Sequence, residues 1–249
     1  GDSLMIQSAG TSAPRTRQMR LCRFGDDRLG VVEGDTVRDV TPALDVLPIV
    51  RYPLPHHDLL IAHLPAVLDR VRALLPQAPS QSLATCRLLS PVANPGKLVA
   101  APVNYQLHLD EVRTDSNLHH NTVGHTITIH SAGLFLKATS SLVGAGEGVA
   151  IRKPDRRTDH EVELAVVIGR TASHVSKADA LSCVAGYCIG LDITIRGSED
   201  RSFRKSPDGY TVLGPWLVTA DEIADPHKLP VKLWVNGTVK QDFNTDDMA

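Results

Sequence analysis

The sequence has few cysteines and no long apolar run, and each lack argues against a broad class of protein. Its 249 residues include four cysteines and no CxxC pair. So few cysteines in a chain of this length favour a reduced, cytoplasmic protein over a disulfide-linked secreted one. No stretch approaches about 18 consecutive apolar residues, so we expect no membrane-spanning helix. The N-terminus also lacks the apolar core of a secretory signal.

The sequence has no excess of charge of either sign. Lysine and arginine number 26 against 28 aspartates and glutamates, which gives a formal net charge of −2 at pH 7. Binding to nucleic acid or to an anionic membrane relies on basic surfaces, so we expect neither as a partner. With 42% hydrophobic and 22% charged residues, the composition is that of a globular protein.

The chain is long enough for a small domain followed by a larger one, and the apolar pattern places the boundary near residue 90. Residues 1–18 lack periodicity and are interpreted as a leader, a tag remnant or a flexible arm. Residues 19–90 are predicted to form the small N-terminal domain. Its expected elements are strands over 19–24, 29–33 and 36–40, and a helical region over 58–75 that Pro65 interrupts.

Residues 91–249 are predicted to form a larger, β-rich domain, so that the fold class is α+β. One helix is expected over 176–185, capped by Ser176 and ended by Gly186. Asn236-Gly237 is a strong signal for a hairpin turn. The predicted strands cover 97–101, 134–137, 149–152, 161–168, 187–194, 216–219, 231–235 and 238–240.

Two glutamates lie on one face of the predicted strand 161–168. Side chains alternate between the faces of a strand, so Glu161 and Glu163 point the same way, about 7 Å apart at the backbone. Such carboxylates repel one another unless positive charge lies between them, and Mg²⁺, Mn²⁺ and Ca²⁺ prefer oxygen ligands. Asp192, beside small residues on the strand over 187–194, could complete a cation site. The alternatives are a solvated strand face for the glutamates and a turn cap for the aspartate.

Two further segments carry residue types suited to catalysis. His108 and Glu111 are three residues apart and can face each other on a helical turn. A carboxylate beside a histidine fixes its tautomer and stabilises the imidazolium, which suits a general base. Lys205, in the basic loop 201–209, could bind a substrate carboxylate or stabilise an oxyanion. The alternatives are a surface histidine, one of 11 in the chain, and a solvated loop.

Seven segments that contain these residues occur in a specific order. They are Asn104-Tyr105 with His108 and Glu111, Phe135-Leu136-Lys137, Glu161 through Gly169, Gly186-Tyr187 through Asp192, Arg204-Lys205-Ser206, Leu213-Gly214-Pro215-Trp216, and Val235-Asn236-Gly237 with Asn244-Thr245. Taken together, they resemble the fumarylacetoacetate hydrolase family over about residues 97–249. Residues 19–90 resemble the small N-terminal domain of some bacterial-type members.

The resemblance implies a fold, a metal and roles for the candidate residues. It implies a contorted β-roll catalytic domain that forms a homodimer, with Mg²⁺ or Mn²⁺ (Ca²⁺ in a crystal) held by Glu161, Glu163 and Asp192. It also implies that His108 and Glu111 activate water, and that Lys205 orients the substrate and stabilises developing negative charge. Lys137 and Tyr105 are further candidates for substrate binding.

The sequence departs from the family pattern at three places. Pro207 stands where many members have Phe, and Ala138 where many have Pro. The sequence ends at Ala249, whereas members continue through more strands and a Gly-Thr segment that helps to bind the substrate carboxylate. We therefore expect a catalytic domain that is truncated or incomplete at its C-terminal end, with part of one wall of the site absent.

The family's substrates are 2-oxo or 1,3-dicarbonyl acids, and three functional hypotheses follow. The first is divalent-metal-dependent hydrolysis of a C–C bond in an acid that resembles fumarylacetoacetate or an acylpyruvate. Water deprotonated by the His108–Glu111 pair would attack the distal carbonyl, and the C–C bond would break to give a carboxylic acid and an enolate. The second is decarboxylation or isomerisation of an oxo-dicarboxylic acid in aromatic catabolism, without an attacking water. The third is a catalytically silent binding module with the same fold.

Overall fold

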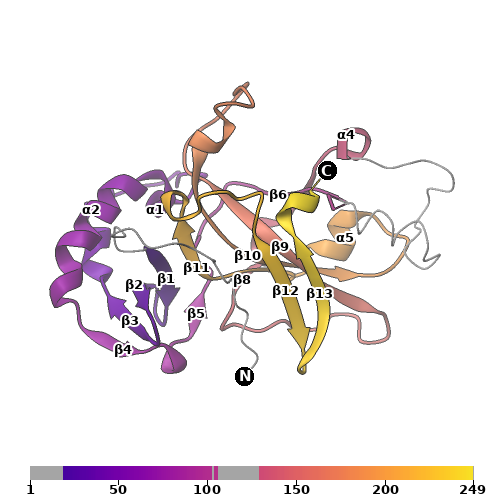
Figure 1. The fold of residues 1–249 in the computed structure, drawn as a ribbon, viewed down its shortest axis with the longest axis horizontal. Helices are drawn as coiled ribbons and strands as arrows, with labels where there is room; N and C mark the ends of the chain where they lie inside the picture. The colour runs from indigo at the N-terminus through magenta and orange to yellow at the C-terminus, as the bar shows by residue number, and fades with distance from the viewer. Residues whose placement is uncertain (1–18, 103, 106–128, 249) are drawn as a thin grey trace.

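The computed structural model describes residues 19–102, 104, 105 and 129–248. The predicted catalytic pair, His108 and Glu111, lies outside the described residues. Figure 1 shows two regions, with the N-terminal strands and helices on one side and a set of long strands extending to the other. In the part of the chain that the structure describes, no helix is long and apolar enough to cross a membrane.

The N-terminal strands form the predicted antiparallel meander. β1 (Arg20–Phe24), β2 (Arg28–Glu33) and β3 (Thr36–Asp39) pair in chain order, and β4 (Ser80–Ser82) pairs with β3. The two turns of the meander contain Gly25 and Gly34, each with a φ of 57°. Glycine adopts this left-handed conformation without the steric penalty of a side chain, which explains the tight turns.

The helical region breaks where Pro65 predicted. Asp58 caps α1 (Leu59–Ala62) by accepting a hydrogen bond from the Ile61 N–H at 3.0 Å, and α2 (Leu64–Leu74) begins with Pro65 in its first turn. Proline has no N–H to donate and is tolerated in a first turn for that reason. One face of α2 buries Val67 and Val71 in a core shared with β1 and β2. Figure 1 shows α2 beside these strands.

One nine-stranded sheet runs from this meander into the second region. Its order is β4-β3-β2-β1-β11-β10-β9. The last three strands are β9 (Thr158–Ile168), β10 (Val184–Ile195) and β11 (Thr211–Thr219), with β5 (Leu88–Leu89) and β8 (Leu142–Gly144) paired beside the main path. Because β1 pairs directly with β11, the sheet is continuous across residue 90. The division into two domains at this point stays a prediction.

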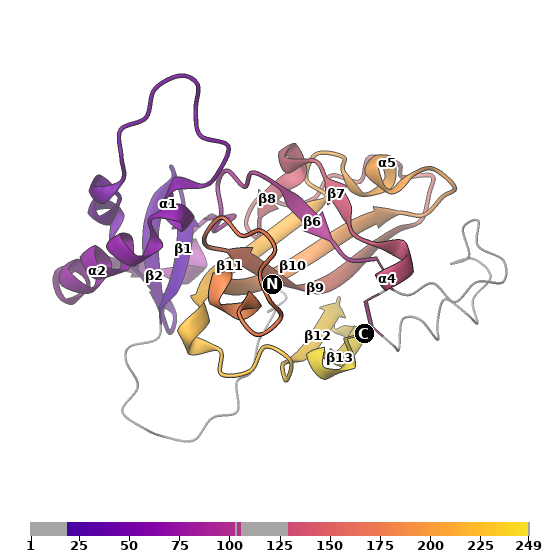
Figure 2. The same cartoon turned by 90° about the horizontal axis from the view of Figure 1, so that it is seen from above.

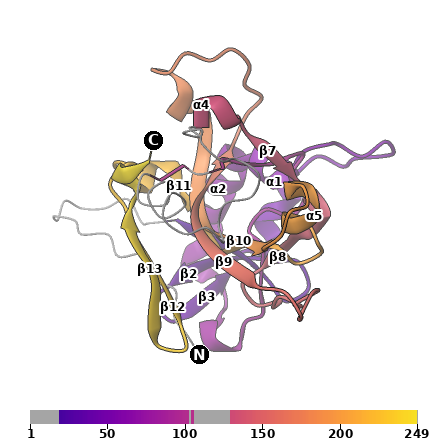
Figure 3. The same ribbon diagram turned by 90° about the vertical axis from the view of Figure 1, so that its right-hand side faces the viewer.

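The remaining strands form two small sheets. β6 (Leu98–Ala100) pairs with β7 (Phe135–Lys137), and β12 (Pro230–Val235) pairs with β13 (Thr238–Asn244) around the predicted Asn236-Gly237 turn. Figures 2 and 3 show that the β12–β13 hairpin lies beside β9, the last strand of the large sheet. The other elements are α4 (Ile129–Ala132), α5 (Arg201–Lys205) and 3₁₀ turns at Thr41–Val46, Leu75–Gln77, Leu83–Thr85, Thr139–Ser141, Ala180–Cys183, Ala220–Glu222 and Thr245–Asp247.

Two predicted elements are wrong, and the predicted loop 201–209 contains the short helix α5 at its start. The helix predicted over 176–185 is limited to a 3₁₀ turn at Ala180–Cys183, because residues from Val184 onward pair with β9. Within that turn Leu181 is 52% exposed, whereas Cys183 is buried, so the segment lacks the buried apolar face of an amphipathic helix. The strand predicted over 149–152 is absent from the described structure, where the Arg152 N–H donates to the Tyr210 hydroxyl at 3.0 Å instead of to a strand.

Leu217 links the second region to the N-terminal core. It lies on β11, is fully buried, and packs into the cluster that contains Leu21, Leu29 and Val67. The predicted β-rich α+β class is confirmed, and its largest buried cluster joins residues that are distant in the sequence. A large side chain at this contact therefore stabilises both regions.

We predict that Leu217→Ala lowers the free energy of unfolding by about 2–5 kcal/mol, since it removes buried methyl groups and leaves a cavity. Leu136→Ala is the matched control, because Leu136 is 61% exposed and should contribute little. Chemical denaturation monitored by circular dichroism measures both variants. Equal stability of Leu217→Ala and the control would contradict the proposed contact between the regions.

Candidate active site on strands β9 and β10

The register of two paired strands places three carboxylates on one face. Asp192 of β10 lies directly opposite Glu161 of β9, and Gly190 lies opposite Glu163. Alternate residues of a strand share a face, so Glu163 and Asp192 lie on the same side of the sheet as Glu161. Like charges at directly opposed positions are destabilising, so this arrangement requires neutralisation.

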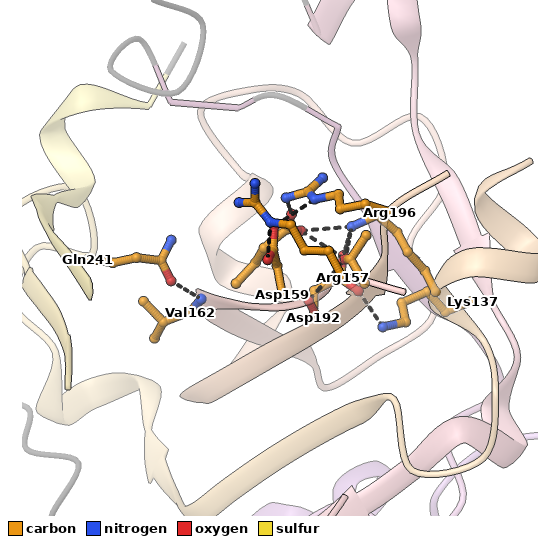
Figure 4. Close-up of polar contacts among 10 residues, drawn as sticks. Lys137, Arg157, Asp159, Val162, Asp192, Arg196 and Gln241 are labelled. Atoms are coloured by element: carbon orange, nitrogen blue, oxygen red, sulfur yellow. Dashed lines mark hydrogen bonds and ion pairs between the residues drawn. The ribbon is translucent and has the colours of Figure 1, made fainter. Parts of the chain in front are cut away.

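Two lysines provide part of that neutralisation. The Lys205 Nζ donates to Glu161 Oε2 and to Asp192 Oδ2, each at 2.7 Å. The Lys137 Nζ donates to Asp192 Oδ1 at 2.5 Å (Figure 4). It also donates to the Tyr210 carbonyl at 2.8 Å. Lys137 is 6% exposed and Lys205 is 8% exposed. Burial lowers the pKa of Lys137, and the charge and hydrogen bond of Asp192 oppose that shift.

The lysines reach the carboxylates from two separate elements. Lys137 is the last residue of β7, and Lys205 is the last residue of the short helix α5. Asp200 caps α5 by accepting a hydrogen bond from the Ser202 N–H at 3.0 Å. The ring of Phe135 lies 5.6 Å from the Lys205 Nζ, and the Thr194 hydroxyl lies 2.7 Å from it. These contacts hold the Lys205 ammonium between Glu161 and Asp192.

An arginine holds Glu161 from the other side. The Arg196 guanidinium donates to Glu161 Oε1 at 2.6 Å and to Asp159 Oδ2 at 2.7 Å. Arg157 also donates to Asp159, at 2.8 Å (Figure 4). Burial opposes ionisation of Asp159, but the hydrogen bonds from Arg157 and Arg196 outweigh burial, so its pKa is lowered. Both oxygens of Glu161 are thus oriented by positive charge.

Glu163 has a different environment from its two neighbours. Burial raises the pKa of Glu163 to about 8, the charges of Glu161 and Asp192 add to this effect, and the two lysines offset only part of it. Among the described residues, no lysine or arginine forms an ion pair with this carboxylate; Lys205 pairs with Glu161 and Asp192 instead. Repulsion therefore opposes the ionisation of Glu163, and an additional cation would offset it.

Tyr105 lies close to this carboxylate. Burial raises the pKa of the Tyr105 phenol, and the negative charges of Glu163 and Asp247 raise it further. Its ring contacts Phe243 of β13, with ring centroids 4.5 Å apart. Tyr105 thus remains protonated at neutral pH and can act as a hydrogen-bond donor at the edge of the site.

The donor set fits a hard divalent cation, although the side chains have a different arrangement in this structure. Three carboxylates are the oxygen ligands that Mg²⁺ and Mn²⁺ prefer, and the residual repulsion at Glu163 favours such an ion. As they stand, no three His, Cys, Asp or Glu side chains within the described ranges are arranged to hold a metal ion. The lysines account for this, because the Lys205 ammonium occupies the space between Glu161 and Asp192.

The structure brings together most of the residues that the sequence singled out. Glu161, Glu163, Asp192, Lys137 and Lys205 share one cluster, with Tyr105 near Glu163, while the roles of all six stay predictions. The sequence analysis missed Asp159, Thr194, Arg196 and Gln241. The first three follow from strand alternation, since Asp159 precedes Glu161 by two residues, and Thr194 and Arg196 follow Asp192 at alternate positions. Gln241 comes from another hairpin and has no local signal.

Comparison with known proteins identifies one family and two similar hydrolases. The sequence profile of a family described as "Fumarylacetoacetate (FAA) hydrolase C-terminal" matches residues 97–249. A maleylpyruvate hydrolase from Aquipseudomonas alcaligenes is 60% identical over 230 residues, which are 92% of this chain and 80% of that protein. A 2,4-didehydro-3-deoxy-L-rhamnonate hydrolase from Sphingomonas sp. (strain SKA58) is 36% identical over 92% of this chain and 74% of that protein.

A solved structure extends the similarity to three dimensions. The maleylpyruvate hydrolase from Sphingobium sp. SYK-6, in complex with manganese(II) ion and pyruvate, is 37% identical with a TM-score of 0.74. The match covers 92% of this chain and 78% of that chain. The similarity confirms the predicted fold, and a divalent metal is present in that relative.

We predict that Lys205→Met, without added metal, lowers the free energy of unfolding by about 3–5 kcal/mol, because two partly buried carboxylates lose their shared cation. Mn²⁺ should then stabilise the variant more than it stabilises the wild type. Arg201→Met is the control, since it removes an equal charge from α5, on a side chain that lies over the Phe135 ring. Thermal unfolding with and without Mn²⁺ measures both effects. A variant as stable as the control without metal would contradict the neutralising role of Lys205.

Proposed function

The chain belongs to the fumarylacetoacetate hydrolase family, and we propose that it hydrolyses a C–C bond of an acylpyruvate, of which maleylpyruvate is the foremost candidate. The predicted class of enzyme, a hydrolase that acts on C–C bonds, is confirmed by the family match and by the 60% identity to a maleylpyruvate hydrolase. The observation that carries the substrate proposal is the cluster of three carboxylates and two buried lysines on one face of β9 and β10.

The charges of this cluster suit an anionic oxo acid. An acylpyruvate carries a carboxylate, and its cleavage develops further negative charge on the enolate of pyruvate. A divalent cation held by Glu161, Glu163 and Asp192 would supply Lewis-acid polarisation of the 2-oxo acid. Lys137 and Lys205, both buried and hydrogen-bonded to Asp192, are placed to orient the substrate and to stabilise that developing charge.

The attacking water needs a base, for which we propose His108 with Glu111. Their three-residue spacing and the family resemblance support this assignment. His108 would take a proton from water, which adds to the acyl carbonyl carbon. The bond from that carbon to the methylene of the pyruvate unit then breaks, and its electron pair passes to the pyruvate enolate, which takes up a proton. Maleylpyruvate and water thus yield maleate and pyruvate.

We further propose Mg²⁺ or Mn²⁺ as the metal and a homodimer as the assembly. The oxygen-only donor set supports either ion, because both are hard cations that accept carboxylate ligands. The manganese(II) in the Sphingobium relative favours including Mn²⁺ in every assay. The homodimer is supported by the family resemblance alone and is measured by light scattering.

The test of this function is a substrate panel assayed with saturating Mn²⁺ and, separately, Mg²⁺. The panel contains maleylpyruvate, fumarylpyruvate, a simple acylpyruvate and an oxo-dicarboxylic acid. We predict release of pyruvate and maleate in equal amounts from maleylpyruvate, measured by chromatography, and loss of that activity after chelation. Release of CO₂ without C–C hydrolysis across the panel would contradict the proposal and favour the decarboxylase.

Replacing the proposed base, His108, tests the activation of water in the same assay. His108→Ala should lower the rate of C–C hydrolysis by about 10²–10⁴-fold, since a positioned general base contributes this much. Mn²⁺ affinity should not change, because the histidine is not among the proposed ligands. The control is His227→Ala, which alters an exposed histidine. Full activity of His108→Ala would show that another group activates the water.

A further inference from the structure

The backbone between the two glutamates is held by a residue from outside the large sheet. β9 is the last strand of that sheet, so the N–H groups of alternate β9 residues point away from β10. The Val162 N–H, between Glu161 and Glu163, donates to the side-chain carbonyl Oε1 of Gln241 at 2.9 Å (Figure 4). Val162 is only 2% exposed. This peptide unit is therefore held both by the hydrogen bond to Gln241 and by the packing of the Val162 side chain.

The hairpin that carries Gln241 is itself well defined. Gln241 lies on β13 opposite Leu233 of β12, which is 5% exposed. Two residues further along β13, Phe243 contacts the ring of Tyr105. The hairpin therefore contacts both the strand that carries the glutamates and the tyrosine beside Glu163. A change in its position would be transmitted to the spacing of the two carboxylates.

We propose that Gln241 is a positioning residue for the metal ligands, whose hydrogen bond to Val162 fixes the backbone that orients Glu161 and Glu163. This inference rests on the proposed function, because it assigns the two glutamates to a bound cation. Outer partners of metal ligands orient those ligands, and their loss typically lowers metal affinity about 10- to 100-fold. Gln241 acts here on the peptide between two ligands, and so affects both.

The test compares three variants of the full chain. Gln241→Met keeps the length of the side chain and removes the carbonyl acceptor. Gln241→Glu keeps an acceptor oxygen at the same position. Lys240→Met places the same new side chain at the neighbouring, exposed position of β13 and serves as the control. The two measurements are amide hydrogen exchange at Val162 and the Mn²⁺ dissociation constant, determined by titration.

We expect Gln241→Met to speed exchange of the Val162 amide by roughly 2- to 10-fold, as the loss of one hydrogen bond predicts. It should also weaken Mn²⁺ binding by about 10-fold. Gln241→Glu should recover both quantities in large part, and Lys240→Met should resemble the wild type. Recovery in Gln241→Glu would show that the effect of Gln241→Met comes from the lost hydrogen bond and not from general damage to the hairpin.

Two results would overturn the inference, and they are distinguishable. Unchanged Mn²⁺ affinity in Gln241→Met, with tight binding by the wild type, would show that the contact only stabilises the hairpin and would leave the proposed function intact. No Mn²⁺ binding by the wild type would contradict the metal site, and with it both the proposed function and the role of Gln241.

Discussion

Electrostatic repulsion among three carboxylates on one face of β9 and β10 is the constraint around which the site is built. Glu161 and Asp192 are directly opposed, and Glu163 is two residues along the same strand. Opposed like charges destabilise a sheet, so the fold must bring cations to this face. It does so with Lys137 from β7, Lys205 from α5 and Arg196, the residue that follows β10.

The same constraint connects structure to function. The cations balance Glu161 and Asp192 but leave repulsion at Glu163, whose pKa is raised to about 8. A site that needs one more cation can accept a divalent ion, and the ion would compete with Lys205 for two carboxylates. In our account, the lysines stabilise the metal-free protein and then serve the substrate when the carboxylates bind metal. On this account, one set of residues would stabilise the metal-free protein and would also take part in catalysis.

The sequence was sufficient for the features that depend on local pattern. Strand alternation predicted that Glu161 and Glu163 share a face, and the Asn236-Gly237 pair predicted the β12–β13 turn. Local pattern failed over residues 176–185, where the Ser176 hydroxyl accepts the predicted hydrogen bond from the Asp179 N–H, but only a short turn forms before strand pairing begins at Val184. It also could not reveal Gln241, because no local rule relates a residue of one hairpin to an N–H group on a distant strand.

The family resemblance supplied what the residues alone left open. Taken alone, the two glutamates and Asp192 were compatible with a solvated strand face and a turn cap. The order of seven segments favoured a metal-dependent hydrolase, and the match to residues 97–249 agrees with it. In this structure, lysines hold the carboxylates of Glu161 and Asp192.

The most direct measurement is the position of Mn²⁺ in a crystal of this protein, located by its anomalous scattering. Our account predicts a single strong peak in contact with Glu161, Glu163 and Asp192, with metal–oxygen distances near those of Mg²⁺, about 2.1 Å. It also predicts that the Lys205 ammonium has left at least one of its two carboxylates. A peak elsewhere, or no peak while Lys205 still bridges Glu161 and Asp192, would contradict the account.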